Sequence, residues 1–176
     1  MYDGWWQSEA YFADVAKEIR QEFTFRNKIE GPTLSLLTKI QNCNSVCLNI
    51  RRTDFLNNPT LNTTSLAYFE RAAQYMIGAL DTPSFFVFSD DIEWCLENIK
   101  LAAPTTFVTH DHKGHKFGNY LQMMAACHHF IIPNSSFAWW AVWLNDAPNK
   151  VVVAPQKWLN GDFNTNDLVP EHWVRL

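Results

Sequence analysis

The sequence predicts an α/β fold, a Rossmann-like parallel sheet with helices on both faces. Short apolar segments of strand length alternate along the chain with segments of helical spacing. The short segments are apolar at successive positions, which is typical of parallel strands covered by helices on either side. The expected strands are 45–50, 84–89, 105–109, 129–133 and 150–155.

The expected helices lie between and before these strands. Residues 65–80 have amphipathic helical spacing and end at the Asp-Thr-Pro stop of 81–83. Asp90, followed three residues later by Glu93, predicts a capping box at the start of a helix over 91–100. The other expected helices are 8–23, 33–40, 118–127 and 135–146.

Composition limits the class of protein. The 176 residues are 47% hydrophobic and 18% charged, which suits one domain with a packed core. The net charge of −4 gives no basic field for nucleic acid, so an anionic ligand must be held by a few placed arginines. Four scattered cysteines without a CxxC pair predict reduced thiols, and no signal peptide or spanning segment is visible. A cytoplasmic location is therefore expected.

In parallel sheets, ligands bind beyond the carboxyl ends of the strands. Nearly all of the expected strands here end in polar residues, and this pattern indicates a shared site. The strand ends collected in this way are 51–54, 89–91, 109–111, 134–136 and 155–157, and the candidates taken from them are Arg51, Asp54, Ser89, Asp90, Asp91, Asn134, Ser135 and Ser136.

Arg51 and Arg52 leave the end of a buried strand. Arginine presents a planar fork of donors that matches phosphate oxygens. Successive side chains at a strand end diverge, so one arginine is expected to face a ligand while the other pairs with Asp54 or packs as structure. An ordinary ion-pair cluster without a ligand is an equal alternative.

Ser135 and Ser136 precede an expected helix, and the start of a helix offers unpaired N–H groups and a positive dipole to an anion. The commoner explanation of such serines is a simple N-cap. The stripe of Trp139, Trp140 and Trp143 that follows is expected to be mostly core.

Asp90 and Asp91 follow another strand, where a carboxylate could cap a helix or accept from ribose or guanine N–H groups. The histidines at 110, 112 and 115 lack the tight ligand pairs of zinc sites. Neither a metal nor a cofactor is predicted, and the pair at 128–129 is expected to be structural.

Four motifs occur in an order and spacing that resemble the bacterial α-1,2-fucosyltransferase family: "NIRRTDF", "FVFSDDIEW", "NSSFAWWAVWLN" and "KVVVAPQKW". The opening of the chain also resembles the helical segment before that family's arginine motif. The resemblance implies the donor-binding half of a GT-B glycosyltransferase, with residues 1–30 from the region between the two lobes and residues 31–176 as the donor domain. It further implies inverting transfer of L-fucose from GDP-β-L-fucose to a glycan hydroxyl, with galactose-terminated acceptors.

The resemblance also implies roles for individual residues. Arg51 would be the catalytic residue that holds the GDP phosphates. Ser135, Ser136 and Phe137 would lie against the phosphates and the nucleoside. The complete expected donor site is Asn49, Arg51, Asp54, Ser89, Asp90, Asp91, Asn134, Ser135, Ser136 and Phe137.

Two departures from the family's pattern leave an alternative open. Asn49 stands where the family has histidine, and an amide cannot take a proton at neutral pH. The family's N-terminal lobe has no counterpart here, so a non-catalytic GDP-sugar-binding fragment or subunit is the second hypothesis. Apolar surface around Trp5, Trp6, Tyr11 and Phe12 is expected to favour self-association or pairing with such a lobe. The expected cytoplasmic location includes a peripheral position at the inner face of a bacterial membrane.

Overall fold

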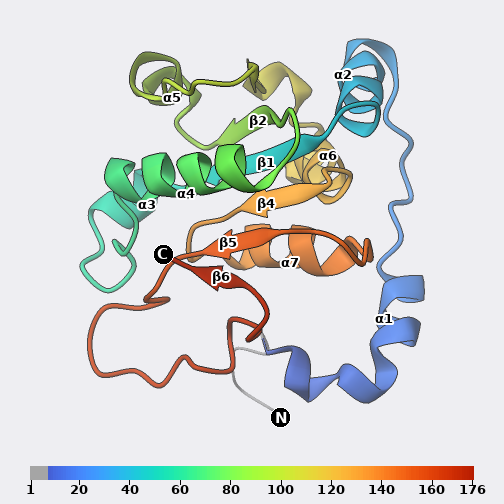
Figure 1. Cartoon of the computed structure of the whole chain (residues 1–176). Helices are drawn as coiled ribbons and strands as arrows, with labels where there is room; N and C mark the ends of the chain where they lie inside the picture. The colour runs from blue at the N-terminus through green and yellow to red at the C-terminus, as the bar shows by residue number, and fades with distance from the viewer. Residues whose placement is uncertain (1–7) are drawn as a thin grey trace.

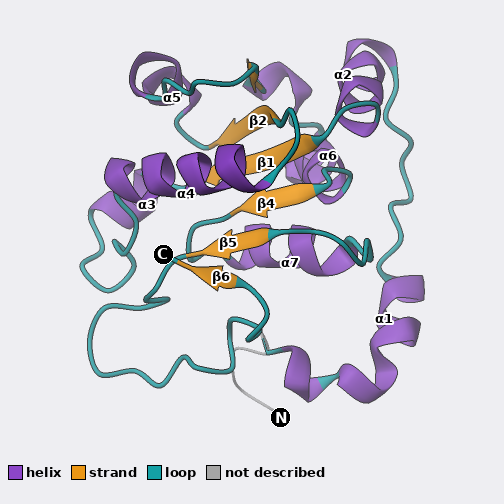
Figure 2. Ribbon diagram, viewed as in Figure 1, coloured by secondary structure: helices purple, strands orange, loops and turns teal. Residues whose placement is uncertain are grey.

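The computed structural model describes residues 8–176, and its centre is a six-stranded sheet in the order β3-β2-β1-β4-β5-β6. All neighbouring strands are parallel, and helices lie on both faces (Figure 1, Figure 2). The predicted fold class is therefore confirmed. The strands are β1 Ser45–Ile50, β2 Ser84–Ser89, β3 Thr105–Phe107, β4 His129–Ile131, β5 Val152–Ala154 and β6 Val174–Arg175.

The direction of chain growth reverses at the middle of the sheet. From β1 the chain adds β2 and β3 on one side, and it then returns to add β4, β5 and β6 on the other. β1 and β4 are paired neighbours, with Leu48 opposite Ile131. The connections after these two strands leave in opposite directions, and this is the position at which an open parallel sheet forms a ligand crevice.

Strand β1 is apolar on both sides because helices cover both sides of the sheet. Val46, Leu48 and Ile50 pack in one core with helix α4, Leu66–Ala79, and Cys47 packs in the other. In Figure 1, α4 lies in front of the sheet, with α6, Gly118–Ala125, and α7, Ser136–Leu144, behind it.

Helices α2, Gly31–Gln41, and α5, Ile92–Asn98, agree with the sequence prediction to within a few residues. Helix α3, Thr53–Leu56, and strand β6 were not predicted. Both are too short to show a periodic pattern, and β6 is held by its pairing with β5. No helix within residues 8–176 combines the length and the apolar character needed to cross a bilayer.

The cap of α5 corrects one expectation. Asp91, not Asp90, is the N-cap, and its Oδ1 accepts from the backbone N–H of Trp94 at 3.3 Å. The helix begins at Ile92, so the motif Asp90-x-x-Glu93 is out of register with the true helix start. Asp90 is thereby free for another role at the edge of the sheet.

The single helix expected over 8–23 is also wrong. Two 3-10 turns, Glu9–Tyr11 and Ala13–Val15, precede a shorter α1, Ala16–Glu22. The expected common apolar face is divided, because Phe12 is buried while Tyr11 and Phe23 remain 57% and 55% exposed.

Tertiary packing explains this break. Trp140 of α7 lies stacked between Phe12 and Phe23, with ring centroids 5.6 and 5.3 Å away. The Arg20 guanidinium covers the Trp143 ring at 4.0 Å. The tryptophan stripe of α7 is thus packing surface, as predicted, and Phe12 does not belong to an exposed patch. Trp5 and Trp6 lie outside the described residues, and the assignment of 1–30 to an interlobe region stays a prediction.

The histidine pair ties together the amino ends of the strands. His128 Nδ1 lies 3.0 Å from the Ser45 hydroxyl, and His129 Nε2 lies 3.0 Å from Asn44 Oδ1. Both contacts are at the edge of the sheet opposite the crevice. The structural role expected for this pair is confirmed.

Removing the Tyr68 hydroxyl tests how α4 is fixed to the carboxyl edge. This buried hydroxyl donates to the Ile132 carbonyl at 2.6 Å. Tyr68→Phe is expected to lower the free energy of unfolding by about 1–2 kcal/mol, because it takes a donor from a buried carbonyl. Urea unfolding with an unchanged m value measures this loss. Tyr75→Phe is the control, since Tyr75 lies on the same helix and is 40% exposed. Equal losses in the two variants would contradict the argument.

Candidate functional site

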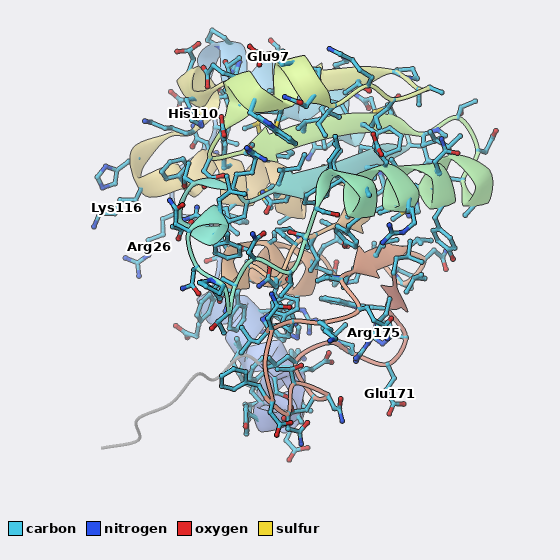
Figure 3. All side chains as sticks on the ribbon, turned by 90° about the vertical axis from the view of Figure 1, so that its left-hand side faces the viewer. Arg26, Glu97, His110, Lys116, Glu171 and Arg175 are labelled. Atoms are coloured by element: carbon cyan, nitrogen blue, oxygen red, sulfur yellow. The ribbon has the colours of Figure 1, made fainter. Side chains whose placement is uncertain are left out.

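A cleft of about 1020 Å³ opens at the carboxyl edge of the sheet. One side is formed by the end of β1 and by α3, another by the start of α7, and a third by the loop that precedes β6. Figure 3 looks onto this edge, with His110 and Lys116 on one side of it and Arg175 on the other. Eight of the residues predicted for a donor site line the cleft: Asn49, Arg51, Ser89, Asp90, Asn134, Ser135, Ser136 and Phe137.

Arg51 reaches the cleft, where two carboxylates neutralise it. Its Nε and Nη2 donate to the two oxygens of Asp54 at 2.9 and 3.0 Å, and Nε lies 3.4 Å from Asp90 Oδ2. The hydrogen bonds to Asp54 raise the pKa of Arg51, and the same bonds hold the pKa of Asp54 below its ordinary value. Asp54 itself does not line the cleft.

Arg52 turns to the other side of the strand end. Its Nε donates to Asp91 Oδ2 at 3.1 Å, and its guanidinium lies 3.6 Å above the Trp94 ring. The predicted divergence of the two arginines is confirmed. Of the two places expected for the arginine that does not face a ligand, packing as structure is confirmed for Arg52. Pairing with Asp54 is wrong, because Asp54 pairs with the arginine that faces the cleft. Asp91, as the partner of Arg52 and the cap of α5, also lies outside the cleft.

Asp90 fixes the start of α3. Its carboxylate accepts from the backbone N–H groups of Arg52 and Thr53 at 2.9 and 3.1 Å, and from the Thr53 hydroxyl. These N–H groups have no partner inside the helix, so a carboxylate from the next strand end satisfies them. Asp90 therefore sets the direction in which the chain leaves β1 after Arg51.

Helix α7 presents its amino end to the cleft. The Ser135 hydroxyl caps it by accepting from Ala138 N–H at 3.5 Å, and no acidic side chain occupies the first turn. At the other end, Lys150 donates to the Val142 and Asn145 carbonyls, while burial lowers the pKa of this lysine. Because the first turn contains no acidic side chain, no residue of that turn neutralises the positive pole of the helix.

Asn134 holds two walls of the cleft together. It is 4% exposed, and its amide donates to the carbonyls of Leu61 and Trp158 at 3.0 and 2.8 Å. Leu61 and Trp158 belong to two loops far apart in sequence, and Asn160 adds a bond from its amide to the Pro59 carbonyl at 2.9 Å. Asn134 Oδ1 is buried and accepts no hydrogen bond within the described chain. The N–H groups of the Asn134 amide thus bind protein carbonyls and connect two loops. The sequence did not indicate this structural role.

Sequence reasoning missed the aromatic lining of the cleft. These side chains come mostly from loops and short elements, where no periodicity marks them, and the only available signal was the high aromatic content of 15%. The missed lining residues with aromatic rings are Tyr11, Phe55, Phe117, Tyr120, Trp158 and Phe163.

The loop before α6 reaches the cleft through a constrained backbone. Lys116 and Phe117 have left-handed backbone angles, with φ of 49° and 61°. Gly114 also has positive φ, and a Cβ there would lie 2.5 Å from the Asn119 side chain, so only glycine fits. Non-glycine residues in this conformation are strained, and such strain often occurs at functional sites.

Asn49 lies at the floor of the cleft, where its amide donates to the Phe88 carbonyl of β2 at 3.2 Å. This contact joins two neighbouring strands. As a carboxamide, the Asn49 side chain cannot act as an acid or a base at neutral pH. Within residues 8–176, no three His, Cys, Asp or Glu side chains gather in a way that could hold a metal ion.

Comparison with known proteins identifies the family. The model described as "Glycosyl transferase family 11" matches residues 1–176. This chain belongs to glycosyl transferase family 11. The resemblance drawn from the four motifs is therefore confirmed.

Two Escherichia coli relatives exceed 30% identity. An alpha-1,2-colitosyltransferase is 34% identical over 98% of this chain and 61% of its own length, and the O-antigen biosynthesis glycosyltransferase WbnK is 32% identical over 77% and 46%. Galactoside alpha-(1,2)-fucosyltransferase 1 of Saimiri sciureus is 25% identical over 78% of this chain and 40% of its own length. The chain thus spans about half the length of these relatives.

The pairing of Arg51 with Asp54 predicts a pH effect. Arg51→Gln is expected to return the pKa of Asp54 toward its ordinary value. An NMR titration that follows the side-chain carboxyl carbon of Asp54 measures this change. Because the folded-state pKa is depressed, the pair stabilises the fold above the unfolded-state pKa, and this stabilisation is lost as the pH falls through the folded-state pKa. Arg52→Gln is the control and leaves the Asp54 titration in place. A similar change in the pKa of Asp54 in both variants would show that the contact with Arg51 does not cause the lowered pKa.

Proposed function

We propose that this chain is the donor-binding part of a glycosyltransferase that transfers L-fucose from GDP-β-L-fucose to a glycan hydroxyl with inversion. The observation that carries the proposal is that Arg51 and the serine-capped start of α7 border the same cleft. Membership of family 11, and relatives named as α-1,2-fucosyl- and colitosyltransferases, support it.

The chemistry requires groups of this kind. When the bond between fucose and the diphosphate breaks, negative charge grows on the leaving oxygen. Arg51 and the positive amino end of α7 would stabilise that charge more in the transition state than in the ground state. Loss of one such donor typically lowers the rate about 10²- to 10³-fold. Ser135, Ser136 and Phe137 would contact the phosphates and the nucleoside.

The remaining predicted residues take other places in the proposal. Ser89 and Asp90 border the cleft and would face the ribose or the base. Asn49 would shape the floor, and Asn134 would hold the walls, so neither takes the proton of the acceptor hydroxyl. Asp54 would act through its ion pair with Arg51. Asp91 would act through the N-cap that it forms on α5.

The sugar of the donor has two candidates. Fucose follows from the sequence motifs, and colitose follows from the relative that is 34% identical. Colitose is fucose without its 3-hydroxyl group, so a cleft that hydrogen-bonds this hydroxyl would discriminate between the two donors. A galactose-terminated acceptor, an association with an N-terminal lobe or with a second copy, and a cytoplasmic location at the inner membrane face remain predictions.

Donor binding and transfer can be measured separately. Calorimetry with GDP and GDP-fucose tests the cleft, and mass spectrometry of a reaction with GDP-fucose or GDP-colitose and lactose tests transfer. The proposal expects both binding and a deoxysugar product. Binding without product would favour the non-catalytic alternative, and failure to bind GDP at millimolar concentration would refute a donor site in this cleft.

Arg51→Ala separates a ligand-binding arginine from a structural one. The change is expected to weaken GDP binding by about 10- to 100-fold, because hydrogen bonds to a charged group are lost. The midpoint of thermal unfolding is expected to stay nearly constant, since the Arg51 side chain is 40% exposed and exposed ion pairs contribute little.

Arg52→Ala is the matched control for this variant. It removes the cover of Trp94 and the ion pair to Asp91, so it is expected to lower stability and leave GDP affinity unchanged. If the two variants behave the opposite way, the arginine pair is an ion-pair cluster and Arg51 is no phosphate ligand.

A further inference from the structure

We propose that Asp54 competes with the donor diphosphate for Arg51 and thereby limits the affinity of the cleft for its donor. This inference rests on the proposed function. It assigns to Asp54 a role opposite to that of a substrate ligand, because its carboxylate occupies the arginine that the substrate requires. Asp54 is thus a residue that sets affinity without lining the cleft.

The geometry of the pair leads to this inference. Asp54 takes Nε–H and one Nη2–H of Arg51 with its two oxygens, at 2.9 and 3.0 Å. This parallel pair of hydrogen bonds is the arrangement in which arginine also grips a phosphate group. The same two N–H groups cannot serve a carboxylate and a phosphate together. A diphosphate that takes this edge of the fork must therefore displace Asp54.

The ion pair between Arg51 and Asp54 is exposed to solvent. The side chains of Arg51 and Asp54 are 40% and 57% exposed, so water can solvate both when they separate. Three hydrogen bonds to Asp90 hold the start of α3 in place, so the Asp54 side chain can rotate away from Arg51 without moving the start of this helix. Its rotation would also give up the contacts of its carboxylate with the backbone N–H groups of Asp54 and Phe55. Asp90, 3.4 Å from Arg51 Nε, stays beside the guanidinium after this release.

The neighbouring ion pair of Arg52 and Asp91 is more buried and has additional contacts. Arg52 and Asp91 are 20% and 31% exposed, the guanidinium is stacked on Trp94, and Asp91 also caps α5. Neither Arg52 nor Asp91 borders the cleft. The two adjacent arginines thus differ in their partners, because Asp54 is more exposed than Asp91 and does not cap a helix.

Asp54→Asn tests the competition through the sign of its effect. Asparagine keeps the size of the side chain and removes the charge, so GDP is expected to bind about two- to fivefold more tightly, a gain of the size expected for an exposed ion pair. Calorimetry with the whole chain measures GDP and guanosine side by side. Guanosine lacks the diphosphate, and its affinity is expected to stay constant. Asp54→Ser is a second variant with the same expected direction.

Two further variants link the effect to the arginine. Asp91→Asn removes the equivalent charge from the other pair while keeping a good capping side chain, and it is expected to leave GDP affinity unchanged. In the double variant Arg51→Ala, Asp54→Asn, the gain over Arg51→Ala alone is expected to vanish, because the two residues act on one another.

The outcomes separate this inference from the proposed function. If the unmodified chain binds GDP and Asp54→Asn binds it equally or more weakly, the competition is refuted and donor binding stands. If the gain extends to guanosine, or persists without Arg51, it does not arise at the diphosphate and the inference fails. If the unmodified chain binds no GDP, the proposed function fails, and this inference fails with it.

Discussion

The reversal of strand order between β1 and β4 is the constraint on which the candidate site depends. The chain leaves these neighbouring strands in opposite directions, so neither connection fills the space beyond their carboxyl ends. Arg51 follows β1 and Ser135 follows the segment after β4, and both therefore border one cleft although more than eighty residues separate them. The apolar strands are fixed by the helices that cover both faces of the sheet. The sheet therefore places the polar residues at the strand ends near one another, even where they make no direct contact.

The cleft handles charge by local pairs and not by a broad positive field. The net charge of the chain is −4, and Arg51 is neutralised by Asp54 and Asp90. The first turn of α7 contains no acidic side chain that would offset the positive potential of its amino end, while Arg20 and Lys150 bind carbonyls near its carboxyl end. A ligand bound in this cleft would therefore be held by a few directed hydrogen-bond donors, and long-range electrostatic attraction would contribute little.

The walls of the cleft depend on contacts between distant segments. Asn134 joins two loops through the carbonyls of Leu61 and Trp158, and the stacking of Trp140 between Phe12 and Phe23 holds the first segment of the chain against α7. These contacts override local preference, and this is why the expected helix over 8–23 is broken into three pieces. An amphipathic pattern predicts which residues are buried. The backbone conformation of these residues depends on the elements that pack against them.

The sequence by itself determined the parallel sheet, the face-covering helices and the set of polar residues at the strand ends, because apolar runs and helical periodicity are local properties of the chain. It also determined the family, through motifs in a particular order. Only the tertiary structure decided which aspartate pairs with the arginine at the cleft and which aspartate caps α5. At a strand end, adjacent side chains point in different directions, and the choice is made by residues from other elements: Trp94 draws Arg52 away, and the N–H groups that start α3 engage Asp90. Such contacts join segments far apart in the sequence, so no local pattern encodes them.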